Sequence, residues 1–486
     1  MIADLASSFW PHFAALVTVL AMVWTAVHII MKKRDTRAAT GWLGLVWFAP
    51  LLGVCLYWLF GINRIQRKAR RKWADKEEVP FPESNFQVDA DAVQAVLRRA
   101  TGGNGLLELC RLSAKVTGRP LLEGNRIKPL CNGDTAYPQM LAAIKRARRS
   151  VALSSYIFDN DAWGRKFQAA LKAALDRGVE VRVLVDAVGA RYSFPSIIGR
   201  LRRDGIPVTA FMKTRLPWRF GYANLRNHRK ILIIDGQTAF SGGMNIRAAS
   251  VLSDKPARPV QDIHFQIQGP VVAEVQQIFA EDWCFCTREK LQGPAWFPFV
   301  DRSGKVLARA IPDGPDEDFN KLMFVMLGAI TTAKSSIRIA TPYFLPDNEL
   351  LIALRVAALR GVEVEILLPG TPNLRLVKWA SDALLEELLQ SGCRIFYSRP
   401  PFDHSKLMVV DGAWVLLGSA NWDARSLALN FEFNVECYDV DLARQVEDII
   451  SGKRHQARRI DLAELRAAGW PVRLRNRLIR LFSPYL

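Results

Sequence analysis

Two short stretches of the chain repeat one arrangement of histidine, lysine, aspartate and asparagine. In each, a His-x-Lys triplet is followed by four apolar residues and an Asp-Gly pair, and an asparagine follows the next short segment. The first copy contains His228, Lys230, Asp235 and Asn245, and the second contains His404, Lys406, Asp411 and Asn421. The chain has only 6 histidines. Two of them in matching frames indicate a pair of imidazoles that act on one substrate.

The spacing predicts what each motif presents. Alternate side chains of a β-strand share a face, so His228 and Lys230 should point the same way while Arg229 points to the other side. Histidine can serve as nucleophile or proton carrier, and ammonium and amide groups can stabilise phosphoryl oxygens. Two such sets predict a phosphodiester site. The apolar runs are typical of buried strands and the Asp-Gly pairs of tight turns, which favours Asp235 and Asp411 as supporting members of the motifs.

The paired motif resembles the signature of the phospholipase D superfamily, whose members carry His-x-Lys-x4-Asp with a trailing Gly-Ser-x-Asn twice and work without a metal. Residues 224–230, 341–344 and 425–432 are similar to the corresponding stretches of the bacterial cardiolipin synthase family, and the resemblance covers nearly the whole chain. One departure is visible. Gly243 stands where the second motif has Ser419, so the two halves need not play equal roles.

The resemblance implies a two-step transfer. His228 attacks the phosphorus of one phosphatidylglycerol while His404 protonates the departing glycerol, and a second phosphatidylglycerol, deprotonated by His404, then displaces His228 to give cardiolipin. The expected catalytic residues are His228, Lys230, Asp235, His404, Lys406 and Asp411. The expected phosphate-binding residues are Asn245, Ser419 and Asn421, the expected histidine-orienting acids are Asp262 and Glu432, and no metal or other cofactor is expected.

The halves match beyond the motifs. Residues 140–144 correspond to 326–330, 155–158 to 342–345 and 177–184 to 360–367. Alternating helices and strands predict an α/β fold: two phospholipase D-like α/β sandwich halves, each with a mostly parallel sheet, related by a pseudo-twofold. Tyr156 and Tyr343 should then open toward one cleft. We expect a membrane anchor at 1–72, the first half at 73–286, a linker at 287–318, the second half at 319–452 and a basic amphipathic tail at 453–486.

The N-terminus predicts two transmembrane or membrane-embedded helices. Residues 5–31 carry no charge and are long enough to span a bilayer, and the absence of a basic residue before Lys32 disfavours a cleaved signal peptide. The second uncharged stretch, 38–63, contains Pro50 and either spans or enters one leaflet and returns. The larger basic cluster, at 64–72, adjoins the catalytic part. This favours a multi-pass protein of a bacterial inner (cell) membrane with its catalytic part on the cytoplasmic side.

The net charge of +19 admits nucleic acid or anionic lipid as partner. Beside a membrane anchor, the bilayer and anionic phospholipids such as phosphatidylglycerol are the simpler interpretation, without nucleic acid. The mixed basic and apolar stretch 213–220 suits either lipid contact or an ordinary cleft wall. The C-terminal residues around Leu474 and Leu478 are typical of an interfacial helix or of a helix packed on the core with its arginines in solvent. The 7 cysteines form no metal or redox pattern.

Three other functions stay open from the sequence. A phospholipase D that releases phosphatidic acid would use the same motifs, and so would a nuclease, although a nuclease has little use for the apolar N-terminus. A non-enzymatic tether that binds anionic lipid is the third. Phosphatidylethanolamine could replace one phosphatidylglycerol, and the oligomeric state is undetermined.

Overall fold

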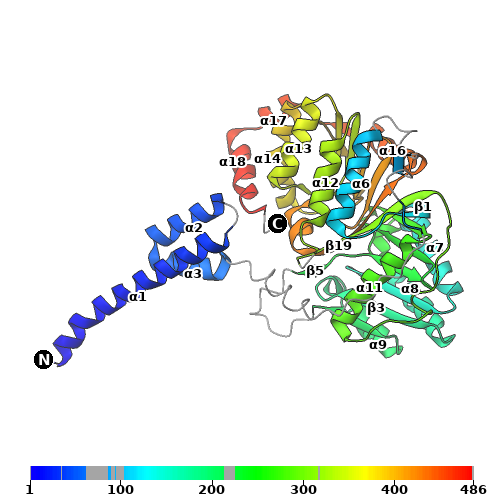
Figure 1. Ribbon diagram of the computed structural model, residues 1–486, viewed down its shortest axis with the longest axis horizontal. Coiled ribbons are helices and arrows are strands. Elements are labelled where there is room, and N and C mark those ends of the chain that lie inside the picture. The colour runs from blue at the N-terminus through cyan, green and yellow to red at the C-terminus, as the bar shows by residue number, and fades with distance from the viewer. Residues whose placement is uncertain are drawn as a thin grey trace. The chain divides into compact units, whose positions relative to one another are not determined.

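The computed structural model describes residues 2–33, 36–61, 86–88, 93–94, 103–212, 225–315 and 318–483. It divides into two compact units, Met1–Ala69 and Arg70–Leu486 (Figure 1). The stretch 213–220 and the basic cluster at 64–72 lie outside the described residues, so the expectations for them are not addressed by the structure.

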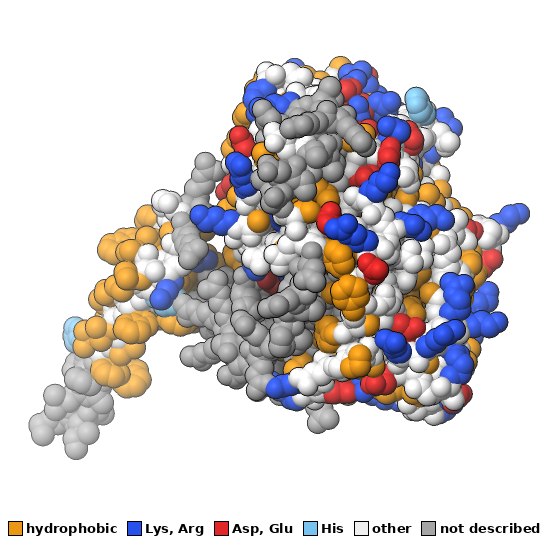
Figure 2. Space-filling view, turned by 45° about the vertical axis from the view of Figure 1, so that its right-hand side comes forward, with side chains coloured by type: hydrophobic (Ala, Val, Ile, Leu, Met, Phe, Trp, Pro, Cys, Tyr) orange, Lys and Arg blue, Asp and Glu red, His pale blue; other side chains and the backbone are white. Residues whose placement is uncertain are grey.

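The N-terminal unit consists of apolar helices. They are α1 (Ile2–Lys32), α2 (Thr36–Phe48), α3 (Pro50–Leu56) and a π-helical turn at Tyr57–Gly61. Pro50 starts α3 because proline, which has no N–H to donate, is tolerated in the first turn of a helix. Hydrophobic side chains cover the outside of these helices (Figure 2). Among the described residues, one helix segment, Trp10–Lys32, is long and apolar enough to cross a membrane, whereas α2 and α3 are shorter.

The second unit is built on one 16-stranded sheet in which the duplication is visible as a repeated strand order. From its edge inward, the first half runs β4, β3, β2, β6, β7, β9, β1, and the second half runs β14, β13, β11, β16, β17, β19, β10. The two runs meet where β1 and β10 pair antiparallel, with Leu122 opposite Ala308. This mirrored order places the pseudo-twofold at the β1–β10 pair.

The strand bounds show the correspondence. In the first half they are β1 (Leu122–Cys131), β2 (Ser150–Ser155), β3 (Glu180–Asp186), β4 (Val208–Phe211), β6 (Ile231–Ile234), β7 (Thr238–Gly242) and β9 (Ile263–Gln268). In the second half they are β10 (Val306–Asp313), β11 (Ser336–Ala340), β13 (Glu363–Pro369), β14 (Arg394–Ser398), β16 (Leu407–Val410), β17 (Trp414–Gly418) and β19 (Asn430–Tyr438), with β20 (Arg458–Arg459) beyond β14. The stretch 287–318 between the halves therefore contains a central strand, β10.

The α/β class and the two halves are confirmed, but the expectation of a mostly parallel sheet is wrong. Along the main strand order, β2, β3 and β4, and likewise β11, β13 and β14, pair in parallel, and the other neighbours pair antiparallel. The motif strands β6 and β16 pair antiparallel with β2 and β11, and the strands after them continue antiparallel. The reason is local. The Asp-Gly turns after β6 and β16 close two-strand hairpins, and a hairpin is necessarily antiparallel.

Helices cover the sheet, and among the buried residues that the structure describes, one hydrophobic core lies in the first half and a second lies in the second half. The first half contributes α7 (Asn132–Arg146), α8 (Ala162–Asp176), α9 (Ile197–Arg203) and α11 (Val271–Thr287). The second contributes α12 (Lys321–Thr332), α13 (Asn348–Leu359), α14 (Arg375–Gln390) and α16 (Val440–His455), joined by α6 (Gly103–Thr117). The chain closes with α17 (Leu462–Ala467) and α18 (Trp470–Arg480), and α18 packs beside α14 (Figure 1). All residues of β6 and β16 are buried, as their apolar runs predict.

Candidate active site

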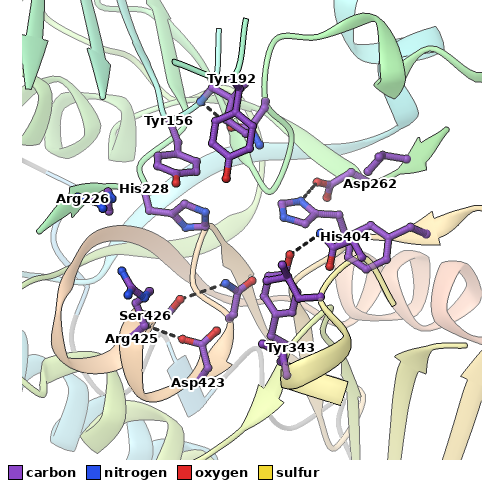
Figure 3. Close-up of a pocket in the computed structure, with 18 of the residues that line it drawn as sticks. Tyr156, Tyr192, Arg226, His228, Asp262, Tyr343, His404, Asp423, Arg425 and Ser426 are labelled. Carbon is purple, nitrogen blue, oxygen red and sulfur yellow. Dashed lines mark hydrogen bonds and ion pairs between the residues drawn. The ribbon is translucent and has the colours of Figure 1, made fainter. Parts of the chain in front are cut away.

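Both motif histidines line one cavity of about 660 Å³ within the second unit (Figure 3). The short strand β5 (Arg226–Asn227) ends just before His228 and pairs with β19 of the other half, where Phe431 lies opposite Asn227. Similarly, β15 (Phe402–Asp403) ends just before His404 and pairs with β8 (Val260–Gln261) of the first half. Each half thus docks its histidine on a strand of the other, which brings the two imidazoles to a shared site.

Each histidine is held by an acid from the opposite half. Nδ1 of His228 lies 2.9 and 3.0 Å from the two carboxylate oxygens of Glu432. Nδ1 of His404 lies 2.7 Å from Oδ2 of Asp262 (Figure 3). Both acids are at most 1% exposed. The family resemblance implied these two acids, but it did not show that each acid contacts the histidine of the other half.

This contact determines the ring tautomer. An ionised carboxylate can only accept a hydrogen bond, so Nδ1 carries the proton and Nε2 is left as the free base. Burial lowers the pKa of both His228 and His404 to about 4, against the opposing effect of the acids. Burial would by itself raise the pKa of Glu432 and Asp262, but their histidines and nearby lysines bring both below the ordinary value. Two neutral imidazoles therefore line the cavity, and each is held by an ionised carboxylate.

The motif lysines are buried beside their histidines. Nζ of Lys230 donates to the backbone oxygen of His228 at 2.6 Å, and Nζ of Lys406 donates to that of His404 at 2.5 Å. Burial lowers the pKa of Lys230 to about 7 and that of Lys406 to about 8, and the Lys406 ammonium further lowers the pKa of Lys230. Arg229 points elsewhere, as strand alternation predicts, and its guanidinium lies 2.7 Å from Asp282.

The asparagines and the Gly-Ser difference lie at the same site. Asn245 and Asn421 both line the cavity. Ser419 is fully buried, and its Oγ donates to Glu432 at 2.5 Å while accepting from the Phe433 N–H. A Cβ on Gly243, its counterpart, would come within 2.4 Å of Oδ1 of Asp262. Ser419 thus supports one acid, whereas Gly243 leaves room for the other, and a direct phosphate contact of Ser419 stays a prediction.

The motif aspartates do not line the cavity, although the sequence groups them with the catalytic residues. The carboxylate of Asp235 accepts from the backbone N–H groups of residues 148, 149 and 150, at the start of β2. That of Asp411 accepts from those of residues 334, 335 and 336, at the start of β11. Both aspartates also have positive φ, 53° and 52°. They hold the turn after each motif strand to the neighbouring strand.

Two charged residues that sequence reasoning missed, the buried Asp282 and the half-buried Lys453, clamp the neighbours of the histidines. Asp282 of α11 accepts from Arg229 at 2.7 Å and from Asn227 at 3.1 Å, on both sides of His228. Lys453 is on α16, the helix that occupies the same place in the second half. Its Nζ donates to Asp403 at 2.9 Å and to Ser405 at 2.8 Å, on both sides of His404. The two clamps have opposite polarity, and nothing in their spacing from the motifs marks them.

Aromatic and basic side chains complete the cavity wall. The ring of Tyr156 lies 4.9 Å from that of His228, centroid to centroid, and Tyr343 lies 6.4 Å from His404, so the two tyrosines do open toward one cleft. Four arginines also line it, Arg226, Arg247, Arg258 and Arg425. Guanidinium groups suit phosphate-bearing ligands because they donate in a planar fork. The described residues contain no group of three or more His, Cys, Asp and Glu side chains arranged to hold a metal.

Comparison with known proteins gives consistent results. Residues 140–283 and 326–453 match the family model described as cardiolipin synthase, PLD-like domain, and residues 20–61 match that described as phospholipase D-nuclease N-terminal. The chain is 33% identical to a cardiolipin synthase of Geobacillus kaustophilus over 99% of this chain and 96% of the relative. It is 34% identical to cardiolipin synthase A of Pseudomonas putida strain GB-1, over 98% of each. A solved phosphatidylserine synthase from Haemophilus influenzae shares the fold, with a TM-score of 0.61 and 16% identity over 78% of this chain and all of that chain.

Proposed function

The chain belongs to the cardiolipin synthase family of phospholipase D-like proteins, and we propose that it transfers a phosphatidyl group between two phosphatidylglycerol molecules, releasing cardiolipin and glycerol. The observation that supports this most directly is the pair of imidazoles on one cavity, each with Nδ1 on a carboxylate of the opposite half. Such a pair can supply a nucleophile at one ring and a proton donor at the other.

In the first step Nε2 of His228 forms a bond to the phosphorus of the donor lipid, and the bond from phosphorus to the glycerol oxygen breaks. His404 gives that oxygen its proton. Because burial lowers the pKa of both imidazoles to about 4, His404 must gain a proton when substrate binds. The phosphodiester anion favours this, since a nearby negative charge raises the pKa of an imidazole.

In the second step His404, now neutral, takes the proton of a hydroxyl on the second phosphatidylglycerol. The resulting oxygen attacks phosphorus, the bond to His228 breaks, and cardiolipin leaves. Two steps through one covalent intermediate replace one difficult displacement. In this proposal Lys230, Lys406, Asn245 and Asn421 stabilise the charge on the phosphoryl oxygens, and general acid–base help is typically worth about 100- to 10,000-fold.

The choice of His228 as nucleophile is part of the proposal. It is supported by the stronger set of contacts on its acid: Glu432 meets Nδ1 of His228 with both oxygens and also accepts from Ser419. This holds the carboxylate in one orientation. Asp262 meets His404 with one oxygen and has no serine in the matching place.

The apolar helix Trp10–Lys32 indicates association with a membrane, which is where such lipids are found. We propose a multi-pass anchor in a bacterial inner membrane, with α2 and α3 embedded beside α1 and the catalytic unit on the cytoplasmic side. Reporter fusions after residue 73 test the side: strong periplasmic activity would refute it. The domain limits derived from the sequence belong to the same proposal.

Incubating the purified protein with phosphatidylglycerol and separating the lipids tests the activity. Cardiolipin with an equal amount of glycerol is the expected result. Phosphatidic acid without cardiolipin would instead identify a phospholipase D, and absence of turnover would identify a lipid-binding tether. Adding phosphatidylethanolamine with a labelled headgroup determines whether it replaces one substrate, since labelled ethanolamine would then be released.

A further inference from the structure

The C-terminal helix α18 is attached to the catalytic unit by its basic side chains. The guanidinium of Arg475 lies over the ring of Trp379 on α14, 4.0 Å from its centroid. Nη1 of Arg480 lies 3.6 Å from Glu387 of the same helix. Ile479 is the residue of α18 that packs against the second hydrophobic core. The inward side of this helix is therefore largely cationic.

The outward side of α18 is apolar. Trp470, Leu474, Leu478 and Leu481 follow each other at helical spacing and are 70, 49, 49 and 73% exposed, with Phe482 beside them at 60%. Surface helices ordinarily show the reverse, with leucines toward the core and arginines in solvent. The sequence left two alternatives for this helix: an interfacial helix, or a helix packed on the core with its arginines in solvent. The observed arrangement does not fit the second alternative, because the leucines face outward. A continuous exposed apolar stripe marks an interaction surface.

The charges beside the stripe identify its partner. Arg473 and Arg477 are exposed next to the leucines, and α18 contains no acidic residue. A partner must therefore offer an apolar interior beneath an anionic surface. An anionic bilayer has this structure, and basic amphipathic helices with tryptophan and leucine on the other face lie in its headgroup region, about 5–10 Å deep.

The helix that carries α18 also contributes to the cavity wall, so docking through α18 would affect where the cavity lies. The helix α14, which carries α18, begins at the cavity: Leu374 and Val377, at its first turn, line it. Leu374 and Leu376 are also half exposed. One rigid helix thus joins the α18 stripe to the cavity wall, so docking through α18 would hold the cavity at the surface from which lipids enter.

We propose that the exposed stripe of α18, formed by Trp470, Leu474, Leu478, Leu481 and Phe482 with Arg473 and Arg477 beside it, docks the catalytic unit on an anionic phospholipid bilayer. This surface is separate from the N-terminal anchor. It acts by keeping the cavity at the membrane, and it leaves the chemistry of the histidine pair unchanged.

The test uses the full chain in nanodiscs of phosphatidylglycerol and phosphatidylcholine. A nitroxide is attached at Leu478→Cys in a protein whose exposed cysteines, Cys55 and Cys131, are serine. Docking predicts that the nitroxide is accessible to oxygen, which dissolves in lipid, and shielded from a water-soluble nickel chelate. Equal access to both would overturn the proposal. Shielding from both would also overturn it, because the stripe would then be covered by protein, either the N-terminal unit or a second copy.

A matched pair of variants tests the consequence. Leu474→Asp with Leu478→Asp should lower the transfer rate on bilayer phosphatidylglycerol about 10- to 100-fold, because two charges enter the interface. Ile352→Asp with Val356→Asp on α13 has the same spacing and similar exposure, 46 and 48%, and should change little. An equal loss in both pairs would overturn the assignment to α18.

Dihexanoyl phosphatidylglycerol, which is soluble, separates docking from chemistry. The α18 variant should convert it as fast as the unaltered protein does, and a parallel loss on this substrate would overturn the proposal. If the unaltered protein makes no cardiolipin from either substrate, the proposed function fails, while the nitroxide measurement still decides the docking.

Discussion

Replacing Glu432 by glutamine removes the charge that fixes the tautomer of His228 and keeps nearly the same shape. At 2.9 Å and an effective dielectric constant of about 20, the carboxylate favours a positive charge on the ring by at most about 6 kcal/mol. The amide can also turn its NH2 group toward Nδ1 and stabilise the wrong tautomer. Loss of the acid partner of a catalytic histidine typically lowers kcat about 10,000-fold. We expect Glu432→Gln to lower transfer about 1,000- to 10,000-fold, within that electrostatic limit.

The assay is a single turnover with phosphatidylglycerol labelled in its acyl chain, stopped in denaturant, with the lipid-bound protein counted. If His228 is the nucleophile, Glu432→Gln should prevent the adduct from forming. Asp262→Asn should form some adduct and resolve it slowly, because His404 can no longer deprotonate the acceptor efficiently. The exposed Asp441→Asn serves as control and should behave as the unaltered protein. The opposite result for the two acids would exchange the roles of the histidines, and transfer by Glu432→Gln within 10-fold of normal would refute the reasoning from tautomers.

Three further predictions concern the surroundings of the histidines. First, the oppositely charged clamps should act in opposite directions. Asp282→Asn removes the negative charge beside Arg229 and lowers the pKa of His228, whereas Lys453→Met removes the positive charge beside Asp403 and raises the pKa of His404. NMR titration of labelled histidines measures both pKa values, and shifts of the same sign would refute a polarity effect. Second, since burial lowers the pKa of Lys230 to about 7, its charge is present below that pH and lost above it. KM for soluble phosphatidylglycerol should therefore rise between pH 6 and 9 with little change in kcat, and Lys230→Arg should weaken this dependence; a flat KM in the unaltered protein would contradict the prediction. Third, Gly243→Ala should displace the carboxylate of Asp262, because the new Cβ would lie 2.4 Å from it. We expect a large loss of activity with a small change in melting temperature. A variant as active as the unaltered protein would show that the acid can move freely.

Much of the site could be predicted from the chain because its residue types and local spacing determine it. The two His-x-Lys motifs, the apolar strands after them and the Asp-Gly turns can all be recognised from short stretches of sequence. The duplication then required both copies to meet across a pseudo-twofold. The prediction of a mostly parallel sheet was wrong because most of each half alternates strands with helices, which is typical of parallel sheets. The Asp-Gly turn is a short signal by comparison, yet the hairpin that it closes makes β6 and β7 antiparallel.

The identities of Asp262 and Glu432 could be inferred from the sequence, but which histidine each acid contacts could not. That pairing depends on β5 docking on β19 and β15 docking on β8, contacts between residues about 200 and 140 positions apart. The clamping contacts of Asp282 and Lys453 could not be predicted from the sequence either. Nor could the outward face of α18, because its residue pattern fits a helix with either side outward.

The sequence by itself determined the chemical groups of this protein, their duplication and the apolar N-terminal helix, because these follow from composition and short-range geometry. Only the tertiary structure decided which acid holds which histidine, which residues line the cavity and which face of α18 is left in solvent. The physical reason is that burial and charge pairing are properties of surfaces brought together by the whole fold, and no local stretch of the chain carries that information.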